Sequence, residues 1–208
     1  SANATVTPPE GVGEQDFIPL AARLPYTVEF EQGADSDEIV SEIRVMTQLD
    51  EDLDLRTFYL GDIQLGDIHV HLPSDRAAFH GDFDFVDELG IVLRVTAGVD
   101  VFTGIALWEL TAIDPLTGLP VEDPSLGLLR PNTDRTELGS VSYTIRPWRD
   151  VTTGTEVESS ARVFFDGDAP VETDAAVVTV DAVAPTTTTE VVDLGNGSYR
   201  LSWAATDD

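Results

Sequence analysis

Short runs in which apolar and polar residues alternate recur along almost the whole chain, and turn-forming residues separate them. Tyr26–Phe30 (YTVEF) and Ile91–Gly98 (IVLRVTAG) show this pattern, whereas apolar residues at helical spacing are scarce. A period of two places alternate side chains on opposite faces of a strand, so that one face is buried and the other meets water. The chain is therefore predicted to consist almost wholly of β-strands.

About ten strands are predicted, each bounded by turn residues. They are Tyr26–Phe30, Ile39–Leu49, Thr57–Leu60, Ile68–Leu72, Ala78–Phe85, Ile91–Gly98, Thr103–Ile113, Gly139–Arg146, Ser160–Phe165 and Ala175–Val180. Residues 39–49 also fit a helix by pattern, but their β-branched residues and the acidic turn that follows favour a strand. So many short strands predict an all-β, antiparallel sandwich, immunoglobulin-like or jelly-roll-like. Its core is predicted to contain Trp108, Tyr143, Phe164 and Phe165.

The composition changes along the chain and suggests where the sandwich begins and ends. Residues 1–16 are polar and read as a linker or leader, and the sandwich is predicted over residues 17–182. Within it, residues 114–137 contain four prolines and predict a long ordered loop. Residues 183–208 begin with a Pro/Thr linker and continue with two β-rich runs around Gly195–Gly197, a strong hairpin signal. Because a lone hairpin is marginally stable, these strands are interpreted as the start of a truncated following repeat.

The charge of the chain narrows the choice of partners. It contains 39 Asp and Glu residues against 11 basic residues, all of them Arg, and its formal net charge is −28. Such a charge repels nucleic acid and anionic lipid, so neither is expected as a partner. No apolar run approaches the ~20 residues of a membrane helix, so membrane insertion is not expected either. A calcium-rich exterior, a high-salt environment and a plain solubilised surface all remain open as reasons for the acidity.

The densest group of acids contains Asp50, Asp52 and Asp54. Calcium prefers several hard oxygen ligands, which alternating aspartates on one turn can supply. An EF-hand is excluded, because Leu55 stands where the loop needs Gly and Gly61 stands where it needs a bidentate Glu. The group is therefore either a different kind of calcium turn or a solvated turn between strands.

Two further groups of acids could also bind calcium. Asp166 and Asp168 follow a predicted strand, and Asp114 and Asp123 lie in the long loop, where a metal would help to order the backbone. Calcium is thus the one cofactor that the sequence suggests, and a solvated turn remains the alternative at each group.

The remaining residue groups and motifs in the sequence do not predict a zinc site or a catalytic site. His69 and His71 share a strand face near His80, but the ligand set of a zinc site is incomplete and exposed histidines are expected. The GxSxG motif and phosphate-binding glycine loops are absent from the sequence. A hydrolase that uses two facing carboxylates remains a third hypothesis, but with this many acids no chosen pair is informative. The chain is not expected to be an enzyme.

Several short motifs resemble an uncharacterised "conserved repeat" domain of large secreted and cell-surface proteins of bacteria and archaea. The match spans roughly residues 24–182 and is most specific in its second half. The matching motifs are Asp114-Pro115, Thr117-Gly118, Val141–Ile145 with Pro147, and Ala161–Asp166 with Pro170 and Thr173. Asp168 stands where the family usually has Asn. The stretch after residue 183 is similar to the start of an immunoglobulin- or fibronectin-type repeat.

The resemblance implies a non-catalytic structural or adhesive module at the cell surface or outside the cell. Its expected partners are neighbouring domains of the same polypeptide and a cell-surface protein or polysaccharide. The main alternative is a carbohydrate-binding module, in which Trp148 and Tyr59 would be the platforms for sugar rings.

Overall fold

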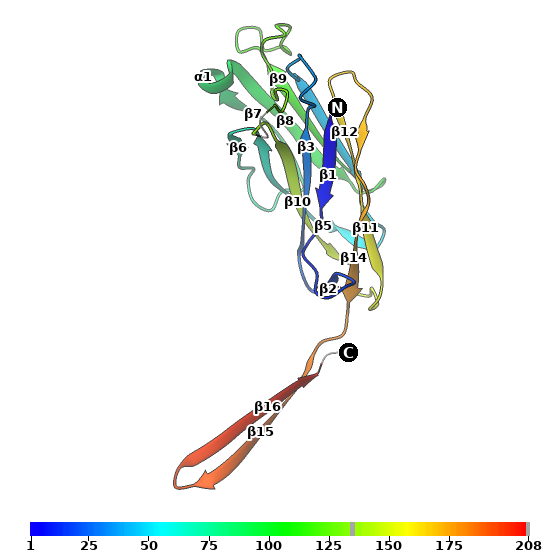
Figure 1. Cartoon of the computed structure of the whole chain (residues 1–208), viewed down its shortest axis with the longest axis vertical. Coiled ribbons are helices and arrows are strands. Elements are labelled where there is room, and N and C mark those ends of the chain that lie inside the picture. The colour runs from blue at the N-terminus through cyan, green and yellow to red at the C-terminus, as the bar shows by residue number, and fades with distance from the viewer. Residues whose placement is uncertain (134–135, 207–208) are drawn as a thin grey trace.

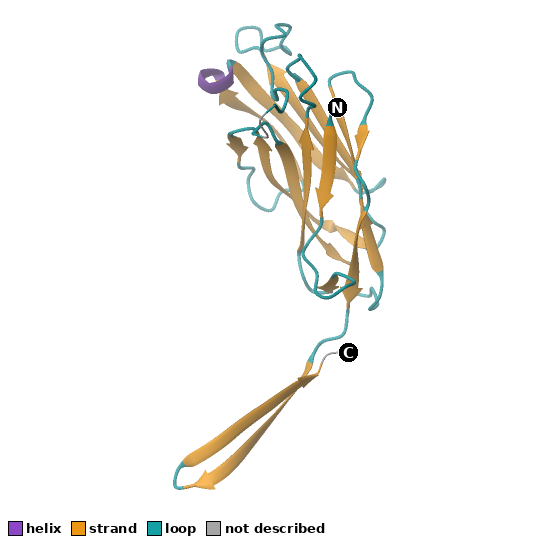
Figure 2. Ribbon diagram, viewed as in Figure 1, coloured by secondary structure: helices purple, strands orange, loops and turns teal. Residues whose placement is uncertain are grey.

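The structure is a computed structural model that describes residues 1–133 and 136–206, and strands dominate it (Figures 1 and 2). The strands before the long loop are β1 Asn3–Thr7, β2 Phe17–Pro19, β3 Leu24–Glu31, β4 Glu42–Gln48, β5 Leu53–Leu65, β6 Ile68–Val70, β7 Ala78–Phe85, β8 Ile91–Asp100 and β9 Ile105–Ile113. Those after it are β10 Gly139–Pro147, β11 Glu156–Ser159, β12 Ala161–Phe165, β13 Val171–Glu172, β14 Ala176–Asp181, β15 Thr186–Gly195 and β16 Ser198–Thr206. One short helix, α1, spans Val86–Leu89, and no helix in the described residues is long and apolar enough to cross a membrane.

Two large sheets form the sandwich. The first has the strand order β1-β3-β10-β5-β6 and the second has the order β13-β12-β4-β9-β8-β7. A small sheet, β11-β14-β2, continues the sandwich toward the end where the chain leaves it (Figure 1). The strand pairs are antiparallel except β14 with β2.

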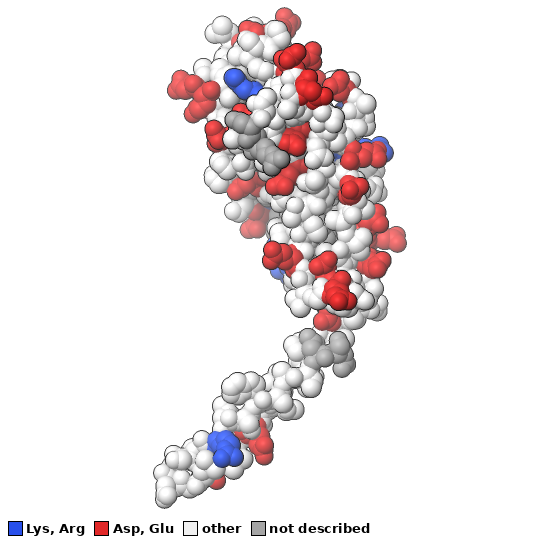
Figure 3. Space-filling view, viewed as in Figure 1, with Lys and Arg blue, Asp and Glu red and all other residues white. Residues whose placement is uncertain are grey.

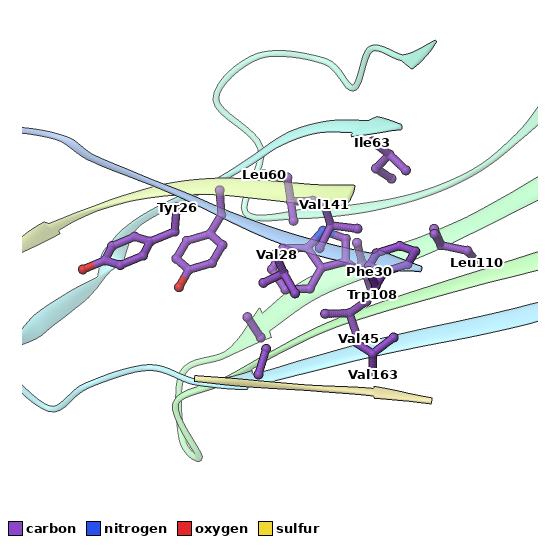
Figure 4. Packing of buried hydrophobic residues seen from close by; sticks show 14 of the residues in the cluster. Tyr26, Val28, Phe30, Val45, Leu60, Ile63, Trp108, Leu110, Val141 and Val163 are labelled. Atoms are coloured by element: carbon purple, nitrogen blue, oxygen red, sulfur yellow. The ribbon is translucent and has the colours of Figure 1, made fainter. Parts of the chain in front are cut away.

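The core lies between the two large sheets and is centred on aromatic rings (Figure 4). Trp108 of β9 is fully buried, and its ring centroid lies 6.2 Å from that of Phe58 and 5.8 Å from that of Tyr143. Tyr143 also stacks on Tyr26 at 5.2 Å. Since Trp108 belongs to one sheet and its partners to the other, these contacts hold the two layers together.

The structure confirms the all-β, antiparallel sandwich. Each predicted strand overlaps an observed one, and residues 39–49, which also fitted a helix, contain strand β4. The alternation of buried and exposed residues is regular, as in β10. Trp108, Tyr143 and Phe165 lie in the core as predicted.

Two predictions are corrected. Residues 1–16 were predicted to be a linker, but Asn3–Thr7 forms the edge strand β1, which pairs with β3 over five residues. Phe164 was predicted to be in the core, but it is only half-buried and lies under the guanidinium of Arg44, 4.4 Å from the ring centroid. Neighbouring residues of a strand point to opposite faces, so Phe164 and Phe165 cannot both face the core.

The long loop is ordered in its described part, as predicted. Val40 and Leu129 form an isolated β-bridge, and Ile113 bridges to Pro120. Leu128 and Leu129 are both buried, so the loop closes over one end of the core.

The last two strands form a separate hairpin. β15 and β16 pair with each other and turn at Asn196, which has a φ of 55°. Side chains on one face of the hairpin, including Val191, Tyr199, Leu201 and Trp203, are exposed. The predicted hairpin is present, and its assignment to a following repeat remains a prediction.

Candidate functional site

The acids that were predicted to bind calcium serve mainly as caps for turns. Asp50 accepts a hydrogen bond from the backbone N–H of Asp52 at 3.0 Å and another from that of Glu158 at 2.9 Å. Its two carboxylate oxygens therefore fasten the β4–β5 turn to β11. The carbonyl of Asp52 accepts a hydrogen bond from the backbone N–H of Trp148 at 2.9 Å.

Asp54 binds an arginine. The guanidinium of Arg56 donates two hydrogen bonds to its carboxylate, from Nε to Oδ1 and from Nη2 to Oδ2, both at 2.8 Å. These hydrogen bonds hold the pKa of Asp54 below its usual range, and the charge of Arg149 lowers it further. The carboxylate of Asp54 is thus paired with an arginine and does not join other acids in a cluster.

The other four predicted ligands lie in three separate segments, of which Asp166 and Asp168 share one. Asp166 accepts hydrogen bonds from the backbone N–H and the hydroxyl of Ser41 and from the backbone N–H of Glu42, at 2.8 to 3.0 Å. Asp114 caps the backbone N–H of Leu116, and Asp123 caps that of Ser125. Asp168 lies two residues after Asp166, where its backbone N–H donates to the carbonyl of Phe165.

In the described part of the chain, no group of three or more His, Cys, Asp or Glu residues is arranged to hold a metal ion. Calcium binding by the seven aspartates therefore remains a prediction. The three histidines are exposed; His71 contacts Asp62 and His80 contacts the hydroxyl of Thr96.

A groove lined by basic side chains lies beside the segment that leaves the sandwich. It has a volume of about 970 Å³, and four of the eleven arginines line it: Arg23, Arg56, Arg146 and Arg149. We call it the arginine groove. Acidic side chains are spread over the visible face of the sandwich in Figure 3, so a concentration of arginines runs against the charge of the chain.

Two aromatic rings contact arginines of the groove. The guanidinium of Arg23 lies 4.5 Å from the ring centroid of Tyr59, and that of Arg56 lies 4.9 Å from the ring centroid of Trp148. Arg23 also donates to the carbonyl of Thr57 at 2.8 Å. Cation–π contacts and hydrogen bonds keep these two guanidiniums in place.

The groove carries more positive than negative charge. Its lining contains two acids, Asp54 and Asp181, beside the four arginines. Among the described residues, no carboxylate forms an ion pair with Arg23, Arg146 or Arg149. The guanidinium donors of Arg146 and Arg149 are therefore available to an anion, whereas Nη1 of Arg23 already donates to Thr57 and Thr144.

Tyr59 and Trp148 were predicted from the sequence as binding residues, whereas the four arginines were not. Strand β10 brings them together, because it pairs with β3 on one side and with β5 on the other. The local signal was Arg146-Pro147-Trp148-Arg149, in which two basic residues flank a tryptophan in an acidic chain.

No family model and no curated protein matches the chain, so its resemblance to the conserved repeat domain remains a prediction. Among solved structures, the major pilin SpaD of Corynebacterium diphtheriae matches with 15% identity and a TM-score of 0.48. That match covers 96% of this chain but 40% of the pilin.

Two further matches have lower scores. The major pilin BcpA of Bacillus cereus is 13% identical with a TM-score of 0.44, over 92% of this chain and 41% of the pilin. A collagen-binding domain of a Staphylococcus aureus adhesin is 13% identical with a TM-score of 0.39, over 85% of this chain and 95% of that domain. At such low identities and scores, these likenesses assign no activity or partner to this chain.

Proposed function

We propose that this chain is a non-catalytic structural module of a larger cell-surface or extracellular protein, and that its sandwich transmits tension between neighbouring domains. The observation that carries this proposal is the placement of the first and last strands. The chain enters the sandwich through β1 in its upper part and leaves it through β14 at its lower end (Figure 1). A module with this geometry separates the domains that it joins.

The pairing of these two strands suits tension along the long axis. β1 pairs with β3 over five residues, and β14 pairs with β11 over four and with β2 over three. Ladder hydrogen bonds lie across the strands, so a pull along a strand strains all the bonds of a pair together. Both terminal strands are therefore loaded in shear, in which no single bond can break first.

The hairpin supports the part of the proposal that concerns a neighbouring domain. Its exposed apolar side chains, among them Leu201 and Trp203, are costly to leave in water. Isolated hairpins are marginally stable, whereas strands that belong to a larger sheet are not. We therefore assign residues 183–206 to a linker and to the first strands of a neighbouring repeat that covers this face.

The proposed location can be tested on cells of the source organism. Antibodies raised against residues 1–183 are expected to label intact cells, and protease added outside the cells is expected to remove the label. An antibody against a cytoplasmic protein serves as the control for leakage. Labelling that requires permeabilised cells would reject the surface location.

Calcium binding is the second part of the proposal, and a melting series tests it. If calcium stabilises the folded chain, EDTA is expected to lower the melting temperature and added calcium to restore it, because an ion that binds only the folded state stabilises it. If EDTA leaves the melting temperature unchanged but molar NaCl raises it, the many acids are instead explained as an adaptation to a high-salt environment.

A carbohydrate-binding module is the second candidate function. It is favoured by the arginine groove, since both of the aromatic residues suggested by the sequence, Tyr59 and Trp148, lie beside it. Each ring has one face covered by an arginine, so the polar groups of the groove, rather than ring stacking alone, would bind the sugar.

A further inference from the structure

We propose that the arginine groove, together with the outer face of β10, binds an anionic polysaccharide through its carboxylate or sulfate groups. This inference rests on the carbohydrate-binding candidate function and names its ligand class. It does not depend on the role of the sandwich as a spacer, because the groove can bind a ligand whether or not the module carries tension.

The first support is the unused capacity of the arginines. Arg146 and Arg149 are exposed and have no ion-pair partner among the described residues, whereas Arg56 is already bound to Asp54. A guanidinium offers several N–H donors in a planar fork that matches carboxylate and sulfate oxygens. Hydrogen bonds between charged groups are about twice as strong as neutral ones. Two free forks in one groove therefore suit a ligand with repeated anionic groups.

The second support is a row of hydroxyls that continues from the groove. The outward side chains of β10 are Ser140, Ser142, Thr144 and Arg146, which alternate with buried residues. At roughly 3.3 Å per residue, this row extends about 20 Å from the first serine to the arginine. Hydroxyls donate and accept hydrogen bonds, as the hydroxyls of a sugar do. The row can thus bind the neutral part of a polysaccharide whose charged groups lie in the groove.

Two hydroxyls of the row are already oriented by the protein. Ser142 donates to the carbonyl of Asp62 at 3.0 Å, which leaves its oxygen free to accept. Thr144 accepts from Arg23 at 3.1 Å, which leaves its O–H free to donate. Both acceptor and donor positions are therefore set before a ligand arrives, and this lowers the entropic cost of binding.

A polysaccharide fits this surface better than an acidic peptide does. One common way for an extended peptide to bind is to add a strand, which requires free backbone groups at a sheet edge. β10 is an inner strand with β3 and β5 on its two sides. The groove lining contains Pro19, Pro147 and Pro185, which have no backbone N–H. Strand addition is therefore not open to a peptide at β10, and the hydroxyl row beside the arginines matches the hydroxyls of a sugar.

The negative charge of the whole chain limits the conditions for binding. At physiological ionic strength the Debye length is about 8 Å, so the charge of acids on remote surfaces is screened, whereas Asp54 and Asp181 of the groove lining and Glu29 opposite Ser140 are near enough to oppose an anion. Binding is therefore expected to be measurable near this ionic strength and to weaken in molar salt.

The test is calorimetric titration of the full chain with oligogalacturonate, with a dextran sulfate fragment and with neutral dextran of similar length. We expect one or both anionic glycans to bind and neutral dextran not to bind. The double variant Arg146→Gln/Arg149→Gln is expected to lose at least about tenfold in affinity, equivalent to about 1.4 kcal/mol. The control Arg76→Gln/Arg162→Gln removes the same charge outside the groove and should keep the affinity of the unsubstituted chain. Circular dichroism verifies that both variants are folded.

Each other outcome overturns the inference in a distinct way. Binding of neutral dextran equal to that of the anionic glycans would keep the carbohydrate-binding function but reject the anionic class. Absence of binding to all three glycans would reject both. Equal losses of affinity in the two double variants would show that net charge attracts the glycans without a specific binding site. Tighter binding of poly-glutamate than of the glycans would assign the groove to an acidic polypeptide.

Discussion

Replacing Trp108 with alanine is expected to lower the free energy of unfolding by about 3–5 kcal/mol, the range for large aromatic residues removed from a core. Trp108 is 0% exposed and contacts aromatic rings of the opposite sheet. Its Nε1 has no hydrogen-bond partner in the described structure, so the loss comes from packing and from the cavity that remains. Since whole domains are stable by only about 5–15 kcal/mol, this variant should be close to unfolding. Urea titration followed by far-ultraviolet circular dichroism measures the change.

Trp203→Ala provides the matched control. Trp203 is 72% exposed on the hairpin and pairs with Thr189. Exposed substitutions usually change stability by about 0.5 kcal/mol or less, so the unfolding midpoint of the sandwich should not move. A loss at Trp203 similar to that at Trp108 would mean that the hairpin packs on the sandwich, and it would contradict the separation of the two units.

The strands were predictable because their signal is local. In β10, and in β8 as far as Ala97, every second residue is buried, and this alternation is visible in the sequence without knowledge of the partner strands. The hairpin was equally clear, because its turn requires a positive φ at Asn196 and at the glycines beside it.

β1 could not be predicted because its stability comes from another strand. Its sequence, NATVT, buries only Ala4, which is too weak a pattern to distinguish from a polar linker. The strand forms because the edge of β3 offers five pairing positions. Phe164, in contrast, could have been assigned correctly from the sequence, since the residue next to a buried Phe165 on a strand has to face outward.

At the candidate sites, the roles of the acids and of the arginines could not be predicted from the local sequence, because they depend on residues far away in the chain. Asp50 binds the backbone of Glu158, which lies 108 residues away in the sequence, so the proximity of Asp50 to other acids in the sequence said little about its role. Arg23, Arg56 and Arg146 meet because of the register of β3, β10 and β5, which no local pattern encodes.

The role as a spacer predicts a strong dependence of the unfolding force on the direction of pulling. Tension between Ser1 and Val183 strains β1 and β14 in shear, so that several ladder bonds must break together. Tension between Ser1 and Ala34 pulls the paired residues Asn3 and Glu31 apart first, so that the ladder opens one bond at a time. The first geometry is therefore expected to resist a much higher force.

Single-molecule pulling between engineered cysteines tests this claim most directly. The chain has no cysteine of its own, so Ser1→Cys with Val183→Cys and Ser1→Cys with Ala34→Cys each give unique attachment points. Forced unfolding reports the unfolding barrier rather than the equilibrium stability, which is the quantity relevant to a module under tension. The account predicts a single unfolding event of the sandwich at high force for the first pair and an early rupture at low force for the second. Equal forces for the two pairs would contradict it.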